Sequence, residues 1–546
     1  MAAKSLKTVK SVKPVKPVKP IKPVTPAKPV KPAAAATLAA TTAAAAASAV
    51  LRAPGSPAQY RARVRMYRHG LGDCFLLTFP RPGQSPFNML IDCGALARNK
   101  GQMSAVVEHI RDTVRDGAGP AVPNAKARLD VVVGTHEHKD HVSGFNQARQ
   151  VFNSDFDFGA VWLAWTENLG QPEIRKIKET RKSALKTLKA ALAASPLAVA
   201  GGPLRHVPSL LGFSDDDDST DQRRVADAME YLKLRGRQAN ALRFLEPGGA
   251  PFALGDVEDV RVYVLGPPRD PSMLKTSAVT ERMKSDDVVY HLGGAGAAAI
   301  DALAAAVPAM SSAGATTADP MADRFQPFSP EHRVSRKLLP QGKKVAISNR
   351  YFAKIMGGVQ SRYDDPQQRW RRIDDDWLGG FGQLALDLDN DTNNTSLVLA
   401  FEFVSKREVL LFVADAQVGS WLSWKTLKFD VPGQAKALPA LDLLRRTVFY
   451  KVGHHCSHNA TLKAGGLELM QREDLVAFIA LDKETARNQG PKEHGGWAMP
   501  APQLFKALGV RANERVVISD IKEPLSAKAA AAGVRATNTF IDYFLV

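Results

Sequence analysis

Three histidines and one aspartate lie within six positions shortly after an apolar stretch of the chain. The stretch is the run of valines at 131–133, and Gly134 ends it, which is typical of a buried strand that stops at an exposed edge. The residues that follow include His136, His138, Asp140 and His141. Imidazole and carboxylate groups bind zinc in proteins and also suit manganese or iron. The sequence therefore predicts a metal site at the end of a strand.

The spacing of these residues separates them into two pairs. Residues two apart in an extended segment point the same way, so His136 and His138 can hold one cation together. The adjacent Asp140 and His141 can turn toward a second cation. The alternative is a polar loop that is rich in histidine by chance, and it is disfavoured because only 12 of the 546 residues are histidine.

Two later strands are also predicted to end in residues that can bind metal. Residues 408–413 lead to Asp415, and residues 447–452 lead to the neighbouring His454 and His455. Either of these histidines could be the ligand, and His454 is favoured because it comes first after the strand. The metal site is thus expected to draw its ligands from three separate strands.

Apolar periodicity predicts the strands and helices that must carry these residues. Residues 61–68 alternate between arginine and mostly apolar side chains, which predicts a half-buried strand with its arginines facing outward. Further strands are predicted over residues 74–79, 88–92, 131–133, 262–265, 383–388, 396–404, 408–413, 447–452, 516–519 and 539–546. Helices are predicted over residues 103–114, 173–194 and 501–508. This mixture of strands and helices predicts an α/β fold.

The predicted helix over residues 173–194 has an apolar stripe between many lysines and arginines. It is either a solvated outer helix or a surface that contacts nucleic acid. The solvated helix is favoured because charged faces of amphipathic helices usually serve only to meet water.

Residues 1–58 differ in composition from the rest of the chain. They hold a Lys-Pro-Val repeat followed by alanines, and nine lysines of this tail supply half of the formal net charge of +18. Repeated proline predicts polyproline II structure or disorder. The tail could be a soluble tether, or its lysines could contact nucleic acid phosphates. Residues 59–546 are predicted to form one domain with insertions at about 150–260 and 270–340.

Cysteine content and hydropathy favour a cytoplasmic protein. Cys74, Cys93 and Cys456 are the only cysteines, too few for a disulfide framework, which favours a reducing compartment. No run of about 18 strongly apolar residues is present, so no membrane span is expected. The alanine-rich residues 33–51 could be mistaken for a secretion signal, but the Lys/Pro segment before them is unlike the basic start of one.

The order of these motifs resembles the metallo-β-lactamase fold superfamily, and within it the hydrolase domain of the ComEC-type DNA-uptake proteins and their soluble bacterial relatives. Residues 70–74 and 90–94 look like that group's opening pair of strands. Residues 394–399 and 411–415 look like its segment leading to a bridging aspartate, and residues 454–457 look like its His-His-Gly-Ser signature. The resemblance covers most of the chain between the tail and residue 520.

This resemblance implies a four-layer αβ/βα sandwich with two divalent ions, most simply zinc, at one sheet edge. It implies that Asp415 bridges the ions, that Asp140 also orients the attacking water or accepts its proton, and that His494 contacts a leaving group or phosphate. The implied metal ligands are His136, His138, Asp140, His141, Asp415 and His454. The residues expected near the substrate or behind the ligands are His455, Ser457, His458, Asp92 and Asn394.

The chain departs from the superfamily pattern at three points. The usual histidine between the first motif and the bridging aspartate has no counterpart, since the corresponding strand ends in Leu-Gly-Pro-Pro at 265–268. Cys456 stands where glycine is usual, and 274 positions separate His141 from Asp415. The missing histidine leaves the coordination of one ion incomplete.

Hydrolysis of a phosphodiester, in nucleic acid or a nucleotide, is the favoured function because the resemblance is to a nucleic-acid-associated group and the chain is basic. Hydrolysis of a small ester, thioester or lactam would use the same ligands. A basic nucleic-acid-binding protein with a structural ion is a third interpretation. It is disfavoured because ligands on three strands are more than stability requires.

Overall fold

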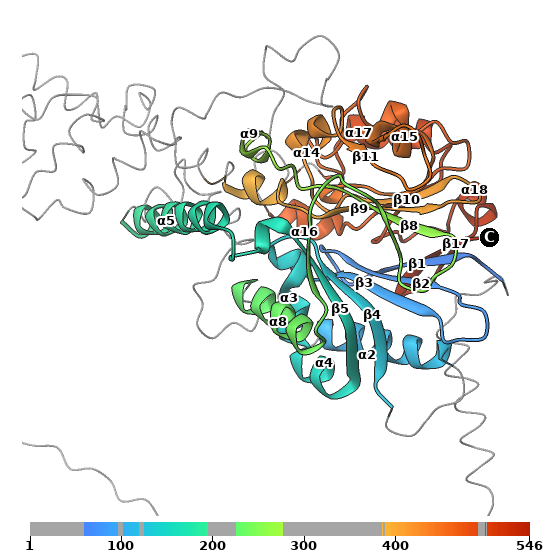
Figure 1. Ribbon diagram of the computed structural model, residues 1–546, viewed down its shortest axis with the longest axis horizontal. Coiled ribbons are helices and arrows are strands. Elements are labelled where there is room, and N and C mark those ends of the chain that lie inside the picture. The colour runs from blue at the N-terminus through green and yellow to red at the C-terminus, as the bar shows by residue number, and fades with distance from the viewer. Residues whose placement is uncertain are drawn as a thin grey trace, which may run out of the picture. The chain divides into compact units, whose positions relative to one another are not determined.

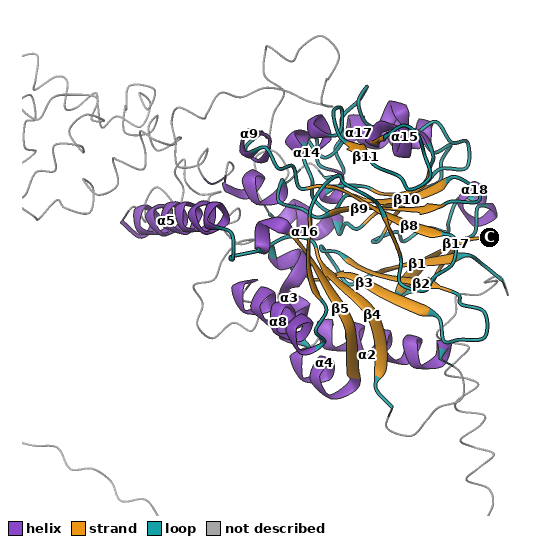
Figure 2. Cartoon of the chain, viewed as in Figure 1, coloured by secondary structure: helices purple, strands orange, loops and turns teal. Residues whose placement is uncertain are grey.

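The computed structural model describes residues 59–96, 102–118, 125–194, 225–276, 385, 388–489, 497 and 499–546. The lysine-rich tail, most of the predicted insertion at 270–340 and His494 lie outside the described residues. The described chain forms two large sheets, and helices lie against both of them (Figures 1 and 2). The protein is therefore of the mixed α/β class.

The first sheet has eight strands in the order β16-β17-β1-β2-β3-β4-β5-β6. Strands β3 to β6 run parallel, and the others pair antiparallel. Their bounds are β1 Ala62–Tyr67, β2 Cys74–Phe79, β3 Phe87–Cys93, β4 Ala127–Gly134, β5 Phe156–Ala164, β6 Leu242–Leu245, β16 Val534–Ala536 and β17 Phe540–Leu545. The valine run at 131–133 is thus the end of β4, buried inside the sheet.

The second sheet has seven strands in the order β15-β14-β13-β10-β9-β8-β7. The bounds are β7 Phe252–Ala253, β8 Val260–Gly266, β9 Val398–Phe403, β10 Glu408–Phe412, β13 Thr447–Lys451, β14 Val476–Ile479 and β15 Val516–Ile518. Strands β10 and β13 are parallel neighbours. Because parallel strands end at the same edge of a sheet, the segments after β10 and β13 lie side by side. A third sheet pairs β11 Lys428–Phe429 with β12 Leu438–Pro439.

Apolar residues form one core between the two large sheets and one further core on the outer face of each. In the central core, Phe75 of β2 and Phe412 of β10 meet edge to face with ring centroids 5.8 Å apart. The outer face of the first sheet is covered by α2 Gln102–Gly117, α3 Lys139–Gln147, α4 Arg149–Asp155 and α8 Val225–Gln238. The second sheet is covered by α14 Val418–Ser423, α15 Ala440–Arg445 and α17 Pro502–Arg511. Figure 1 shows these helices on opposite sides of the pair of sheets.

The remaining helices are short, apart from one. They include α5 Pro172–Ala194, α9 Pro271–Leu274, α16 Lys483–Asn488 and α18 Ala527–Ala531. Helix α5 is the predicted basic helix, and α2 and α17 are the other two predicted helices. In the described part of the chain, no helix combines the length and the apolar character needed to cross a membrane.

The segment predicted as an insertion at 150–260 contributes to the sheets. Strands β5 and β6 complete one edge of the first sheet, and α8 packs against its outer face. The strand predicted over 383–388 differs from the structure, since the described residues 385 and 388–393 are helical. Ala385, Leu388 and Thr392 are buried at helical spacing. The buried residues of this segment therefore follow the period of a helix and not the alternation on which the strand prediction was based.

The arginines of β1 do not face outward as the alternation predicted. Arg65 is fully buried, and its guanidinium donates to both carboxylate oxygens of Asp542 in β17 at 2.7 and 2.8 Å. It also donates to Thr113 of α2 at 3.1 Å and lies over the ring of Phe540, 3.4 Å from its centroid. Strand β1 lies between β17 and β2 with α2 over its outer face, so the charge of Arg65 is buried and is paired with Asp542 inside the protein.

Candidate metal centre

The first histidine motif lies in the turn between β4 and α3. His136 follows β4 by two residues, His138 is the N-cap of α3, and Asp140 and His141 occupy its first turn. The ends of β2 and β3 lie against this turn, and a Cβ at Gly94 would be only 2.4 Å from backbone atoms of the Asp140–His141 peptide. Glycine is therefore required there for the close approach of two backbones.

The second half of the centre comes from the ends of β10 and β13. Four residues there, Ala414, His454, His455 and Cys456, have φ between 43° and 66°. This left-handed conformation is uncommon for residues other than glycine and occurs where the backbone must turn sharply to aim a side chain. The φ of 66° at Cys456 gives a physical reason why glycine would suit that position.

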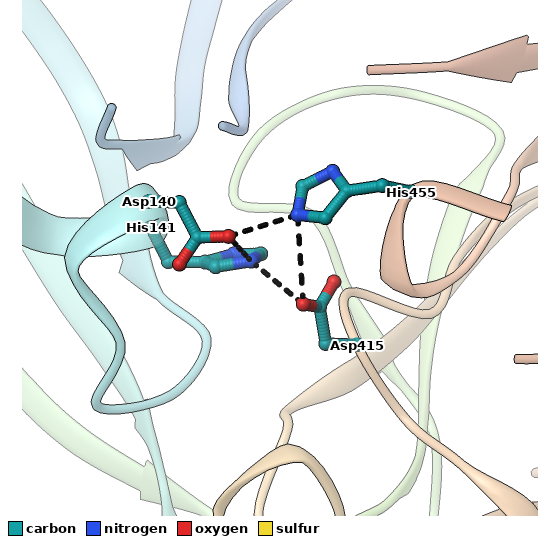
Figure 3. Close-up of side chains that lie close together, drawn as sticks. All are labelled: Asp140, His141, Asp415 and His455. Carbon is teal, nitrogen blue, oxygen red and sulfur yellow. Dashed lines mark hydrogen bonds and ion pairs between the residues drawn. The ribbon is translucent and has the colours of Figure 1, made fainter. Parts of the chain in front are cut away.

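Four side chains from these segments meet at one point (Figure 3). One ligand atom from each lies within 4.8 Å of the others, and the four residues are Asp140, His141, Asp415 and His455. Nε2 of His455 lies 2.8 Å from Asp140 Oδ2, and Nε2 of His141 lies 3.1 Å from Asp415 Oδ2. All four residues are buried. Two histidines and two carboxylates thus lie close together in the interior of the protein.

The two histidines of this group are held through their other ring nitrogens. Nδ1 of His141 lies 2.8 Å from Asp92 Oδ2, and Asp92 Oδ1 accepts the backbone N–H of Thr135 at 2.8 Å. Nδ1 of His455 lies 2.5 Å from the carbonyl oxygen of Ala480. Metal-binding histidines usually donate the second ring N–H to such an acceptor, which leaves the first nitrogen for the ion. Asp92 therefore lies behind His141, on the side of the ring away from the group of four.

His136 and His138 form a second pair beside the group of four. His136 Nε2 lies 3.2 Å from His138 Nδ1, and the rings of His136 and His141 have centroids 4.1 Å apart. Burial lowers the pKa of His136 well below its usual value and that of His138 to about 3. Both rings are therefore neutral at pH 7, which is the form that binds metal.

A buried lysine lies beneath the centre and was not singled out in the sequence. Nζ of Lys451, in β13, pairs with Asp73 and lies 3.5 Å from Asp415 Oδ1. Burial would raise the pKa of Asp415, but the charges on His141, His455 and Lys451 hold it well below its usual value. A lysine inside the apolar strand before the two histidines was the available signal, because lysine is almost never fully buried without a partner.

The residues present fit a bound cation. Asp140 Oδ1 is buried and has no hydrogen-bond partner among the described residues, an arrangement that is costly unless a bound cation or water satisfies the oxygen. Burial, together with the charges on Asp140 and Asp415, raises the pKa of Asp389 to about 8. Three carboxyl groups therefore lie near one another in this region. The donor set of imidazole and carboxylate suits divalent transition metals. The group could therefore hold a metal ion.

The structure brings His455 into the group in place of the favoured His454. His454 is half-buried, and its Nδ1 lies 2.8 Å from Ser457 Oγ and 3.2 Å from Gln417 Nε2. The left-handed turn after β13 directs His455 inward and His454 aside. His454 was favoured because it comes first after the strand, but the backbone conformation of the turn decides which side chain faces the centre.

The other predicted residues occupy supporting or outer positions. Asn394 Oδ1 accepts the backbone N–H of Gln417 at 3.1 Å and so supports the loop that carries Asp415. Ser457 is buried beside His454, whereas His458 is exposed. Strand β8 ends at Gly266 and brings no histidine to the centre, as its sequence predicted.

Comparisons with known proteins give no relative for this chain: no family model, no curated protein and no solved structure matches it.

Proposed function

We propose that this protein is a metal-dependent hydrolase that uses a metal-activated water to cleave a phosphodiester. The observation that carries the proposal is the buried meeting of Asp140, His141, Asp415 and His455, drawn from the ends of three strands. The histidine pair beside this group exceeds what one four-coordinate structural ion needs, which supports a centre of two divalent ions. Zinc is the favoured metal for this donor set, with manganese or iron as alternatives.

We further propose that the chain adopts the four-layer αβ/βα sandwich of the metallo-β-lactamase superfamily. The three apolar cores support this arrangement, because one lies between the sheets and one lies between each sheet and its helices. The order of the motifs along the chain also supports it. The three cysteines are free and buried, which supports a cytoplasmic setting.

Two bound ions would lower the pKa of a shared water and stabilise the attacking and leaving oxygens of an in-line displacement. Asp140 would accept the proton of the attacking water at Oδ1, because Oδ2 already contacts His455. Asp92 and the carbonyl of Ala480 keep the Nε2 atoms of His141 and His455 directed at the centre. Lys451 holds one oxygen of Asp415 and leaves the other facing the histidines.

Basic residues of α5 support a polyanionic substrate such as nucleic acid or a nucleotide. Glu137 lies within the first histidine motif, and its Oε2 is 3.0 Å from Lys178 Nζ. Helix α5 therefore contacts the turn between β4 and α3 that carries this motif. Several basic residues of this helix are exposed: Arg175, Lys176, Lys182 and Lys186. Positive charge near the centre would attract phosphates, and added salt would weaken that attraction.

A diesterase assay on the wild type and Asp140→Ala tests the proposal. The substrates are bis(p-nitrophenyl) phosphate and single-stranded DNA, each with zinc or manganese. We expect metal-dependent turnover by the wild type and a fall of roughly 10²-fold or more in the variant, because the variant loses both a ligand and the proton acceptor.

The matched control is Asp112→Asn, which changes an exposed carboxylate on α2 and should leave turnover unchanged. Equal turnover by the wild type and Asp140→Ala, or no turnover with any divalent metal, would refute the hydrolase proposal. Cleavage of p-nitrophenyl acetate without cleavage of either diester would instead assign the centre to small esters.

A further inference from the structure

The superfamily pattern has a histidine near Gly266, and this chain has none there. Other residues of the chain must therefore hold His136 and His138 in position. Their facing nitrogens, His136 Nε2 and His138 Nδ1, are 3.2 Å apart. Two nitrogens that bind the same zinc ion, each at about 2.0–2.1 Å from it, are separated by roughly this distance. These are therefore the two nitrogens that would share an ion, and the other nitrogen of each ring is left to contact the protein.

Each outward nitrogen of this pair faces an oxygen acceptor. Nδ1 of His136 lies 3.1 Å from Thr135 Oγ1, and the Thr135 hydroxyl donates to Asp92 Oδ2 at 2.7 Å. Nε2 of His138 lies 3.6 Å from Asp389 Oδ1, and the side chains of His138 and Asp389 are 1% and 12% exposed. A carboxylate facing the outer nitrogen repeats the arrangement in which Asp92 faces Nδ1 of His141.

The position of Asp389 is fixed by the helical turn over residues 388–393. Asn393 Nδ2 donates to Asp389 Oδ2 at 3.1 Å, which leaves Oδ1 facing His138. Leu388 and Thr392 anchor the turn in the interior. The chain then continues to Ser396, whose Oγ accepts the backbone N–H of Asp415 at 3.2 Å. One short segment thus supports ligands on both sides of the centre.

We propose that Asp389 is the positioning residue of the first ion: its carboxylate faces Nε2 of His138 and keeps Nδ1 of that ring directed at His136. This inference rests on the proposed function, because it assigns a role toward an ion of the same centre. Direct coordination by Asp389 is disfavoured by the geometry. Asp389 lies beside Nε2 of His138, whereas the nitrogen that faces His136 is Nδ1.

Zinc competition titrations of the full-length wild type and Asp389→Asn against a chromophoric chelator test this role. The amide keeps the size of the carboxyl group but cannot ionise when an ion binds to the neighbouring histidines. We expect the wild type to bind two ions and the variant to bind one of them about 10- to 100-fold more weakly, which is the usual effect of removing a partner behind a metal ligand. The affinity for the other ion should not change, and neither should the circular dichroism spectrum.

Two further variants keep the test decisive. Asp391→Asn removes a neighbouring carboxylate of the same turn and should bind zinc like the wild type. If Asp389→Asn does not fold, Asn393→Ala replaces it, because this variant removes only the donor that holds Asp389 Oδ2. Asn393→Ala should weaken the binding of the same zinc ion and leave the affinity for the other ion unchanged.

The outcomes separate this inference from the proposed function. Two unchanged affinities in a folded Asp389→Asn or Asn393→Ala protein would overturn the positioning role and leave the hydrolase proposal standing. Complete loss of one ion in Asp389→Asn would overturn it in favour of direct coordination by Asp389. A wild type that binds no zinc would overturn the proposed function itself.

Discussion

Asp415→Asn is expected to lower metal-dependent diester hydrolysis by roughly 10³-fold or more, because losing even one fixed electrostatic contact to a transition state commonly costs 10²- to 10³-fold. Asp415 Oδ2 lies 3.1 Å from His141 Nε2 and 3.8 Å from His455 Nε2, and Oδ1 faces Lys451. The amide keeps the shape of the side chain but removes the negative charge between the proposed ions. Turnover at saturating metal and the metal content of the purified variant measure the effect.

Asp430→Asn is the matched control for this variant, since it changes an exposed carboxylate in the segment between β10 and β13. It should retain the turnover and metal content of the wild type. An Asp415→Asn protein that binds metal and turns over like the wild type would show that Asp415 does not hold the ions.

Asp542→Ala is expected to lower the free energy of unfolding by about 3–5 kcal/mol, because it leaves the buried guanidinium of Arg65 without its charge partner. The pair joins β1 to β17 deep inside the first sheet and is far more costly to break than a surface pair. Chemical denaturation followed by circular dichroism measures the change.

A surface pair of the same residue types provides the control. Arg81 and Asp256 are 2.6 Å apart, but the side chain of Asp256 is 50% exposed, so Asp256→Ala should cost no more than about 1 kcal/mol. The double variant Arg65→Met with Asp542→Leu should recover much of the stability, because it removes both buried charges together. Equal losses in Asp542→Ala and Asp256→Ala would show that burial of the Arg65 pair has no energetic consequence.

Much of the secondary structure near the centre could be predicted because the candidate metal-binding residues follow apolar strands. Strands β4, β10 and β13 were predicted from runs of apolar residues, and each is buried in the structure. The helices α2, α5 and α17 were predicted from their apolar spacing. These signals are local, so they survive even when distant parts of the chain are unknown.

The choice between His454 and His455 could not be predicted because it depends on backbone conformation after β13. Successive residues in an extended segment point to opposite sides, but here three residues in a row have positive φ. The carbonyl of Ala480, after β14, then fixes the ring of His455. Neither the turn nor this acceptor has a signature in the neighbouring sequence.

The buried polar partners were missed for a related reason. Arg65 was predicted to face water because arginine usually does, and its partner Asp542 lies 477 positions away. The roles of two other buried residues likewise depend on distant partners. Lys451 lies beside Asp73 and Asp415, and Asp389 lies beside His138. Long-range pairing of charges therefore requires the structure.

Anomalous X-ray diffraction from crystals of the zinc-loaded protein, measured at the zinc absorption edge, tests the central claim most directly. The account predicts two peaks, one among Asp140, His141, Asp415 and His455 and one between His136 and His138. An anomalous map without a peak at the group of four would contradict the proposal that this site is a hydrolytic metal centre.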